Sequence, residues 1–163
     1  MIRLGMILIL MLAVSPALAM SNRPNTQVIV TGRPAPEFTL ETVSGKSLTL
    51  TQARQGKKTV LFFWATWCPH CHEELERVRQ DLAQIQSKGV TVLLVNVGET
   101  KEDAAAFLKH QQIPLDSFVD EDNTVSGQYG VVGIPSLFFI DEKGVIHRVE
   151  HEFPSDYINA FNQ

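Results

Sequence analysis

Cysteine is scarce in this chain: the 163 residues contain two, Cys68 and Cys71, with two residues between them. A framework of several disulfides is therefore excluded. A single structural disulfide usually joins distant segments, because its stabilisation grows with the length of the loop that it closes. A bond between these two cysteines would close almost no loop. The spacing therefore favours a reactive pair of thiols over a structural crosslink.

Basic residues are also in short supply, with 14 Lys and Arg against 18 Asp and Glu and a net charge of −4. No segment forms a polybasic face, so nucleic-acid binding has no electrostatic support. Long apolar runs are missing too, apart from one at the N-terminus. The remaining composition, 44% hydrophobic and 20% charged, is typical of one compact globular domain.

The N-terminal apolar run is typical of a secretory signal peptide. Arg3 precedes about 11 apolar residues at 4–14, whereas a helix that spans a bilayer needs roughly 20. Small residues then occupy the −3 and −1 positions of a cleavage site after Ala19. We therefore predict a signal peptide over 1–19 and a flexible linker over 20–35. An uncleaved membrane anchor is the alternative, and either arrangement places the domain in the periplasm or another extracytoplasmic compartment.

The remaining residues, 36–163, are predicted to form one α/β domain. Apolar residues alternate on both sides of a Ser44-Gly45 turn, which is typical of a β-hairpin. Strands and helices then alternate along the chain, and this order favours a mixed sheet with helices on both faces. The expected strands are 59–66, 90–98, 117–120, 133–141 and 145–151, and the expected helices are 69–87, 100–111, 121–130 and 154–163.

The chemistry of the cysteine pair follows from its place in this plan. Cys68 falls where a buried strand stops and a helix starts, with Pro69 in the first helical turn. Free backbone N–H groups and the positive end of the helix favour the thiolate, which is the reactive form of cysteine. Cys71 lies one turn further on and is expected to be more buried. Cys68 would therefore attack a partner disulfide, and Cys71 would resolve the mixed disulfide.

His70 lies in the gap between the two cysteines and is predicted to tune them. An imidazolium, or an imidazole N–H, beside Cys68 would stabilise the thiolate and make the couple more oxidising. A solvated loop histidine with little effect is the alternative. No role is expected for three histidines elsewhere in the chain, His110, His147 and His151.

Two segments, FFWATWCPHC at 62–71 and GIPS at 133–136, resemble motifs of thioredoxin-fold proteins. The likeness is greatest to exported thiol:disulfide oxidoreductases of the TlpA type, which include proteins of cytochrome c maturation, and it covers about 33–162. Exported oxidases of the DsbA type share the CPHC tetrapeptide but carry a larger all-helical insertion. Residues 100–120 instead predict one additional helix and strand, as in the TlpA type.

The resemblance implies a role for each residue of these motifs. Cys68 would be the nucleophile and Cys71 the resolving thiol, with Trp67 as the aromatic side chain beside the exposed sulfur. Pro135 would follow a cis peptide bond and face the dithiol. The backbone of Ile134 would then turn toward Cys68, so that an extended substrate could pair with it as an added strand.

Acid–base chemistry at the site departs from that of thioredoxins. They place a buried aspartate six residues before the first cysteine, where this chain has Phe62. Glu74 lies three residues after Cys71 on the same helical face and is predicted to act as the acid/base group, as a glutamate does in TlpA-type reductases. The alternative is a surface glutamate on a charged helix, where Glu73 pairs with Arg77.

Three other interpretations compete with this one. The stretch CPHCH offers four metal ligands in one loop, but His70 and His72 point away from each other on a starting helix. A copper chaperone that uses both sulfurs is therefore favoured over a tetrahedral zinc site. A thiol peroxidase would carry a threonine three residues before the reactive cysteine, where this chain has Ala65. The third interpretation is an interaction module with an inert cysteine pair.

The sequence thus predicts an exported thiol:disulfide oxidoreductase that exchanges electrons with cysteine pairs of other exported proteins. It needs no cofactor, because the dithiol carries the electrons, and it is expected to be a monomer that a membrane electron donor or acceptor resets. His70 favours disulfide formation or isomerisation. The TlpA-like scaffold and Glu74 favour reduction, with apocytochrome c as a candidate substrate, and we give reduction the preference.

Overall fold

The computed structural model of the chain describes residues 31–161. The predicted signal peptide over 1–19 lies outside this range, as do residues 20–30 of the predicted linker and the last two residues of the chain. Within the described residues, no helix combines the length and the apolar character that crossing a membrane requires.

A five-stranded mixed sheet forms the centre of the domain, in the order β5-β4-β3-β6-β7. β3, β4 and β5 run parallel, and β6 runs antiparallel to both of its neighbours. Every residue of β3 from Thr59 to Trp64 is buried, which confirms the prediction of a central strand covered on both faces. The strands are β3 (Lys58–Trp64), β4 (Val90–Val97), β5 (Ser117–Asp120), β6 (Ser136–Ile140) and β7 (Ile146–Glu150).

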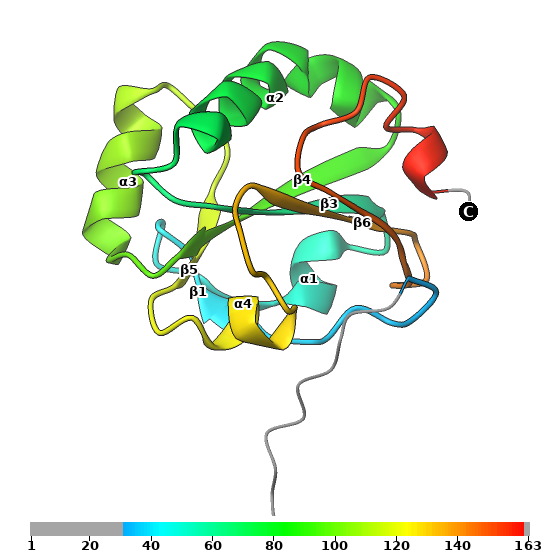
Figure 1. Cartoon of the computed structure of the whole chain (residues 1–163), viewed down its shortest axis with the longest axis horizontal. Helices are drawn as coiled ribbons and strands as arrows, with labels where there is room; N and C mark the ends of the chain where they lie inside the picture. Colours follow the sequence, from blue (N-terminus) through cyan, green and yellow to red (C-terminus); the bar gives the residue numbers. More distant parts are fainter. Residues whose placement is uncertain (1–30, 162–163) are drawn as a thin grey trace, which may run out of the picture.

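Helices cover both faces of this sheet, as predicted (Figure 1). The side chains of β3 alternate between the two faces. Phe62 and Trp64 pack in the core that lies against α2 (Pro69–Ser87) and α3 (Lys101–His110). Phe63 packs in the opposite core, which α1 (Leu50–Arg54), α4 (Thr124–Gln128) and the N-terminal hairpin close. The alternation of β3 thus divides the apolar interior into two layers.

The insertion expected over residues 100–120 is present as α3 followed by β5. Thr100 caps α3, because its hydroxyl accepts a hydrogen bond from the Asp103 amide at 3.2 Å. β5 then pairs in parallel with β4 and extends the sheet by one strand. The additional helix and strand are therefore part of the main sheet and of its helical layer.

The hairpin of β1 (Thr39–Glu41) and β2 (Ser47–Thr49) is confirmed, with Leu40 paired to Leu48. It is one residue shorter than the alternation predicts, because Leu50 begins the helix α1. The Thr49 hydroxyl accepts the Gln52 amide at 3.1 Å, and the Gln52 side chain accepts the Thr49 amide at 2.9 Å. This capping box ends the strand, and the sequence-based prediction overlooks it.

The helix predicted over 154–163 is wrong in its described part, where turns lead into the 3₁₀ helix η1 (Asn159–Phe161). The backbone bonds there are of the i→i+3 type, for example from the Tyr157 amide to the Pro154 carbonyl at 3.2 Å. Tyr157 and Phe161 are both buried on the α2 side of the sheet. Their spacing suits an α-helix, but so short a segment gains few α-helical bonds against the cost of nucleation. We therefore attribute the 3₁₀ conformation to packing of the Tyr157 and Phe161 rings against the sheet.

Part of the predicted linker belongs to the folded domain. The Gly32 amide donates to the Ile146 carbonyl at 2.7 Å, and the Ala35 amide donates to the Gly144 carbonyl at 2.8 Å. These bonds lie at the start of β7 and in the turn before it, so the hydrogen-bonded structure begins ahead of the predicted boundary at residue 36.

Candidate active site

The two cysteines lie at the junction that the sequence predicts, between the end of β3 and the start of α2. They are joined by a disulfide with a Cα–Cα distance of 5.2 Å. Cys68 is the N-cap of α2, and its sulfur accepts a hydrogen bond from the Cys71 amide at 3.1 Å. Pro69 occupies the first helical turn, where it has no N–H to leave unpaired. The helix start therefore directs a backbone donor at the Cys68 sulfur, which favours its thiolate when the pair is reduced.

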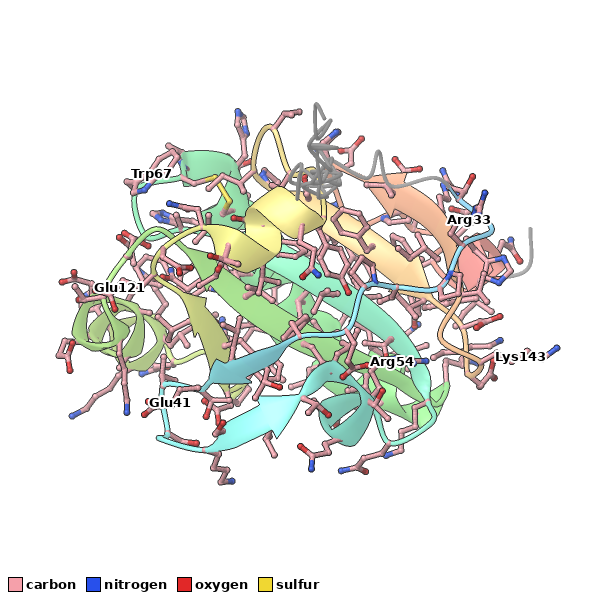
Figure 2. The ribbon with its side chains drawn as sticks, turned by 90° about the horizontal axis from the view of Figure 1, so that it is seen from below. Arg33, Glu41, Arg54, Trp67, Glu121 and Lys143 are labelled. Atoms are coloured by element: carbon pink, nitrogen blue, oxygen red, sulfur yellow. A yellow bond between two sulfur atoms is a disulfide. The ribbon has the colours of Figure 1, made fainter. Side chains whose placement is uncertain are left out.

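The two cysteines are buried, whereas the neighbouring tryptophan is exposed. Cys68 is 4% exposed and Cys71 is fully buried. The Trp67 side chain is 68% exposed and stands at the rim of the molecule near the yellow sulfur–sulfur bond (Figure 2). A partner protein would therefore meet Trp67 first and reach Cys68 before Cys71, which matches the order of attack and resolution predicted for the pair.

The loop before β6 faces the disulfide. The peptide bond between Ile134 and Pro135 is cis, as the resemblance implies. The Ile134 carbonyl oxygen lies 3.7 Å from the Cys68 sulfur. Sheet register explains this contact, because Phe63 near the end of β3 pairs with Ser136 at the start of the antiparallel β6. The strand predicted from residue 133 thus begins at 136, and the preceding residues form the loop.

His70 lies in the first turn of α2 and is open to solvent. Its side chain is 81% exposed, and its Nδ1 atom lies 3.6 Å from Oε2 of Glu73, which is 71% exposed. A protonated His70 would therefore share its charge with a carboxylate as well as with solvent. Tuning of Cys68 by His70 stays a prediction.

Glu74 lies one helical turn after His70 and, in contrast to it, is only 5% exposed. Its Oε2 accepts the Phe153 amide at 2.7 Å, and its Oε1 lies 3.5 Å from Nη1 of Arg77. The alternative of a surface glutamate is therefore wrong, and Arg77 pairs with Glu74 in place of Glu73. The helper site of thioredoxins is occupied by Phe62, which is fully buried in the core.

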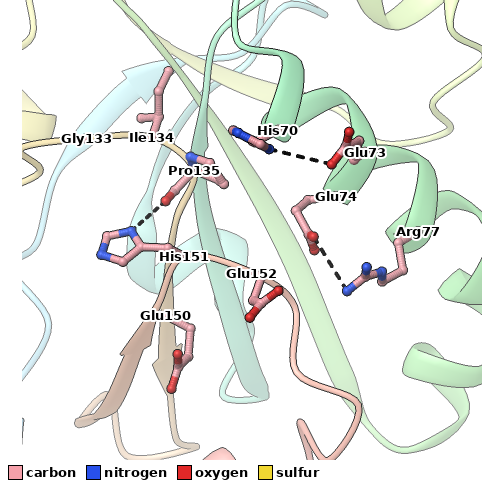
Figure 3. A pocket seen from close by; sticks show the side chains of 10 residues that line it. All are labelled: His70, Glu73, Glu74, Arg77, Gly133, Ile134, Pro135, Glu150, His151 and Glu152. Atoms are coloured by element: carbon pink, nitrogen blue, oxygen red, sulfur yellow. Dashed lines mark hydrogen bonds and ion pairs between the residues drawn. The ribbon is translucent and has the colours of Figure 1, made fainter.

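A cavity of about 460 Å³ opens between the start of α2, the loop before β6 and the segment after β7 (Figure 3). Glu74 points into this space from α2, and Pro135 borders it from the facing loop. The residues that line it are His70, Glu73, Glu74, Arg77, Gly133, Ile134, Pro135, Glu150, His151 and Glu152. The cavity thus joins the predicted acid/base group to the cis-proline loop.

His151 belongs to this site, although the sequence predicts no role for it. Its Nδ1 atom lies 2.8 Å from the Pro135 carbonyl oxygen, so the ring donates to that carbonyl from Nδ1 (Figure 3). The pairing of β6 with β7 places Glu150 opposite Leu137 and so brings the next residue beside the loop. Working out that register from the sequence would have identified His151.

Glu99 holds the other loop of the site. Its Oε2 accepts the Thr66 amide at 2.7 Å and the Asn96 side-chain amide at 2.7 Å, and its Oε1 accepts the Thr66 hydroxyl. Thr66 lies two residues after β3, and Glu99 lies two residues after β4. Parallel strands end at the same edge of a sheet, so this pairing could also have been read from the sequence.

The histidines of CPHCH diverge, as expected. His70 is exposed, whereas the Nε2 atom of His72 lies 2.6 Å from the Thr66 carbonyl oxygen. Among residues 31–161, no three His, Cys, Asp or Glu side chains come together in a way that could hold a metal ion. Binding of Cu(I) by the two sulfurs alone stays an untested alternative.

Known proteins that are similar to this chain are named as thiol-disulfide oxidoreductases or thiol:disulfide interchange proteins. The AhpC/TSA family matches residues 31–149. Thiol-disulfide oxidoreductase ResA of Bacillus subtilis (strain 168) is 32% identical over 148 residues, which cover 91% of this chain and 82% of ResA. Thiol:disulfide interchange protein DsbE of Pseudomonas fluorescens biotype C is 42% identical over 121 residues, covering 71% of this chain and 63% of that protein.

A solved structure supports the same assignment. The crystal structure of a secreted Mycobacterium tuberculosis disulfide oxidoreductase, homologous to E. coli DsbE, has a TM-score of 0.62 and 25% identity, and the match covers 72% of this chain and 84% of that one. The mixed sheet between helical layers and the Cys-X-X-Cys pair at a helix start agree with these relatives. The chain therefore belongs to the AhpC/TSA family and is a thioredoxin-like thiol-disulfide oxidoreductase of the ResA/DsbE type.

Proposed function

We propose that the protein is exported and reduces disulfides in other exported proteins, with the cysteine pair of apocytochrome c as a candidate substrate. The signal-peptide layout of residues 1–19 supports export. The name of the Mycobacterium tuberculosis relative, a secreted disulfide oxidoreductase, supports it as well. No cofactor takes part, and a membrane electron donor returns the oxidised pair to the dithiol.

Reduction would proceed in two exchanges. The Cys68 thiolate attacks one sulfur of the substrate disulfide, forms a mixed disulfide and releases the other substrate sulfur as a thiolate. The Cys71 thiolate then attacks the Cys68 sulfur, which forms the Cys68–Cys71 disulfide and releases the second substrate thiolate. Two electrons pass to the substrate, and the protein is left in the disulfide form that the structure contains.

Glu74, a glutamate at the offset where TlpA-type reductases carry one, is buried and supports the proposed direction. Cys71 is fully buried, and a buried thiol loses its proton reluctantly. Glu74 lies on the same helical face three residues later and is 5% exposed, so it is suited to take that proton for the second exchange. His70, the feature that favours an oxidase or isomerase, is exposed and faces Glu73. The buried Glu74 therefore supports reduction more strongly than the exposed His70 supports oxidation.

The reduction potential of the Cys68–Cys71 pair tests this direction. Equilibration of the purified protein with glutathione buffers, followed by thiol trapping, measures it directly. Related dithiols span roughly −270 to −120 mV, and we expect a value in the lower half of that range. A potential above roughly −150 mV would contradict the reductase and favour the disulfide-forming alternative.

A further inference from the structure

The turn that leads into the cysteine pair is short and closely held. The Cys68 amide donates to the Ala65 carbonyl at 3.3 Å, so Thr66 and Trp67 are the two central residues of a turn. The conformation of Thr66 therefore sets the direction of the chain just before the exposed Trp67 side chain and the Cys68 sulfur. A partner protein meets these two groups first, so their placement depends on the contacts that hold Thr66.

Glu99 holds the amino side of Thr66. Its carboxylate accepts both the backbone amide, at 2.7 Å, and the hydroxyl of Thr66. The Asn96 side chain, itself fully buried in β4, donates to the same carboxylate at 2.7 Å and so fixes its position. Three donors thus converge on one carboxylate.

His72 holds the carbonyl side of Thr66. Its Nε2 atom lies 2.6 Å from the Thr66 carbonyl oxygen, and a carbonyl only accepts, so the ring donates from Nε2. The backbone amide of His72 donates to the Cys68 carbonyl at 3.2 Å. One residue of α2 is therefore bonded to the turn at Thr66 and at Cys68.

The imidazole ring of His72 also packs against an aromatic side chain of α3. Its centroid lies 4.7 Å from that of the Phe107 ring, at an interplanar angle of 38°. Phe107 in turn lies 5.3 Å from the Trp64 ring at the end of β3. The additional helix α3, which carries Phe107, thus buttresses the ring that holds the turn before Cys68.

We propose that His72 is a positioning residue for thiol–disulfide exchange. With Glu99 on the other side, its Nε2 donor fixes Thr66 and so sets the placement of Trp67 and the Cys68 sulfur relative to an incoming disulfide. His72 acts through the Thr66 carbonyl, to which its Nε2 atom is bonded. The inference needs only dithiol chemistry and does not depend on the direction of electron flow.

Three variants of the full chain test this role. His72→Phe keeps an aromatic ring against Phe107 but removes the donor. His72→Gln removes the ring, yet its side-chain amide can reach the carbonyl as Nε2 does. His110→Phe alters an exposed histidine on α3 and is the matched control. The measurement is the rate constant of the reduced protein with oxidised glutathione, together with the pH profile of Cys68 alkylation.

We expect His72→Phe to react about fivefold more slowly, the size of effect that one net hydrogen bond supports, and to shift the alkylation profile of Cys68 to higher pH. His72→Gln should stay within about twofold of the unaltered protein and keep its profile, on the same scale. His110→Phe should match the unaltered protein in both measurements. Equal rates for His72→Phe and the unaltered protein would overturn the proposal, as would equal losses in His72→Phe and His72→Gln.

Folding is checked by thermal unfolding of each variant. Should His72→Phe not fold, Phe107→Leu replaces it, because this change leaves the donor in place and removes only its aromatic support. Phe107→Leu is then expected to be slower than His72→Gln in the same exchange assay. A rate equal to or above that of His72→Gln would overturn the proposal.

Discussion

The exposed and the buried side chains of the first turns of α2 differ sharply. His70 and Glu73 are 81% and 71% exposed and form a loose pair at 3.6 Å. Cys71 is fully buried and Glu74 is 5% exposed, with a backbone amide and Arg77 as partners. Charges in solvent interact weakly, whereas charges out of solvent interact strongly. The buried Cys71 and Glu74 should therefore control the chemistry, although the exposed His70 is the more conspicuous residue of the motif.

The two histidines of CPHCH show the same contrast at a separation of two residues. His70 lies between the cysteines, and its position alone suggests a role in tuning them. His72 lies outside the cysteine pair, yet it is bonded to Thr66 and packed on Phe107. Distance along the chain from a reactive residue is thus a weaker guide than the contacts that the fold supplies.

Replacing each cysteine by serine should give the largest effects and should separate the two sulfurs. Cys68→Ser is expected to lose all exchange activity, because the buried Cys71 sulfur cannot reach a partner. Cys71→Ser should instead accumulate mixed disulfides through Cys68, which non-reducing gels and mass spectrometry would identify. The double variant is the control. Mixed disulfides on Cys68→Ser would contradict the assigned order of the two thiols.

Glu74→Gln should have the next largest effect. The amide oxygen can still accept the Phe153 amide, but the group that takes a proton is lost. We expect the second exchange, in which Cys71 releases the substrate, to slow by at least about tenfold, below the usual range for a general base. Stopped-flow mixing with a peptide disulfide measures this step.

Glu73→Gln is the matched control for that experiment, because the neighbouring carboxylate is 71% exposed. It should leave the second exchange within about twofold of the unaltered rate, as expected for a charge in solvent. Equal losses in the two variants would mean that net charge near the helix start matters and that burial of Glu74 does not.

His70→Ala should have the smallest effect of the series. The exposed ring is compensated by Glu73, so its field at Cys68 is expected to be weak. We predict a change in the alkylation rate of Cys68 of less than about threefold at pH 7, measured with iodoacetamide. A change of tenfold or more would reverse the comparison and show that the motif histidine tunes the pair in spite of its exposure.

Much of the fold could be predicted because it follows from local patterns. A run of apolar residues predicts the buried strand around Phe62, and a 3.6-residue period of apolar residues predicts the helix that begins at Pro69. The cysteine pair at their junction followed from the same patterns. The cis bond before Pro135 required the family resemblance, since no local pattern specifies it.

The site residues that the sequence did not predict depend on pairing between segments that are far apart in the chain. His151 reaches the site through the register of β6 with β7, and Glu99 reaches it through the parallel ends of β3 and β4. Both residues are far from the cysteines in sequence. The error at 154–161 has a similar origin, because packing onto the sheet outweighed a spacing that suits an α-helix.

The antiparallel pairing of Phe63 with Ser136 has a consequence for how the chain can vary. Cys71 and Pro135, which belong to the two loops of the site, are 64 positions apart in the sequence. The distance between the loops in space is nevertheless set by one residue pair, Phe63 with Ser136, on adjacent strands. The intervening chain is thus free to change in length wherever it turns in solvent, as it does at the exposed Gln111 and Gln112. A few glycines and serines inserted there should leave thiol reactivity untouched, so this turn is a natural point for attaching a reporter or a second domain.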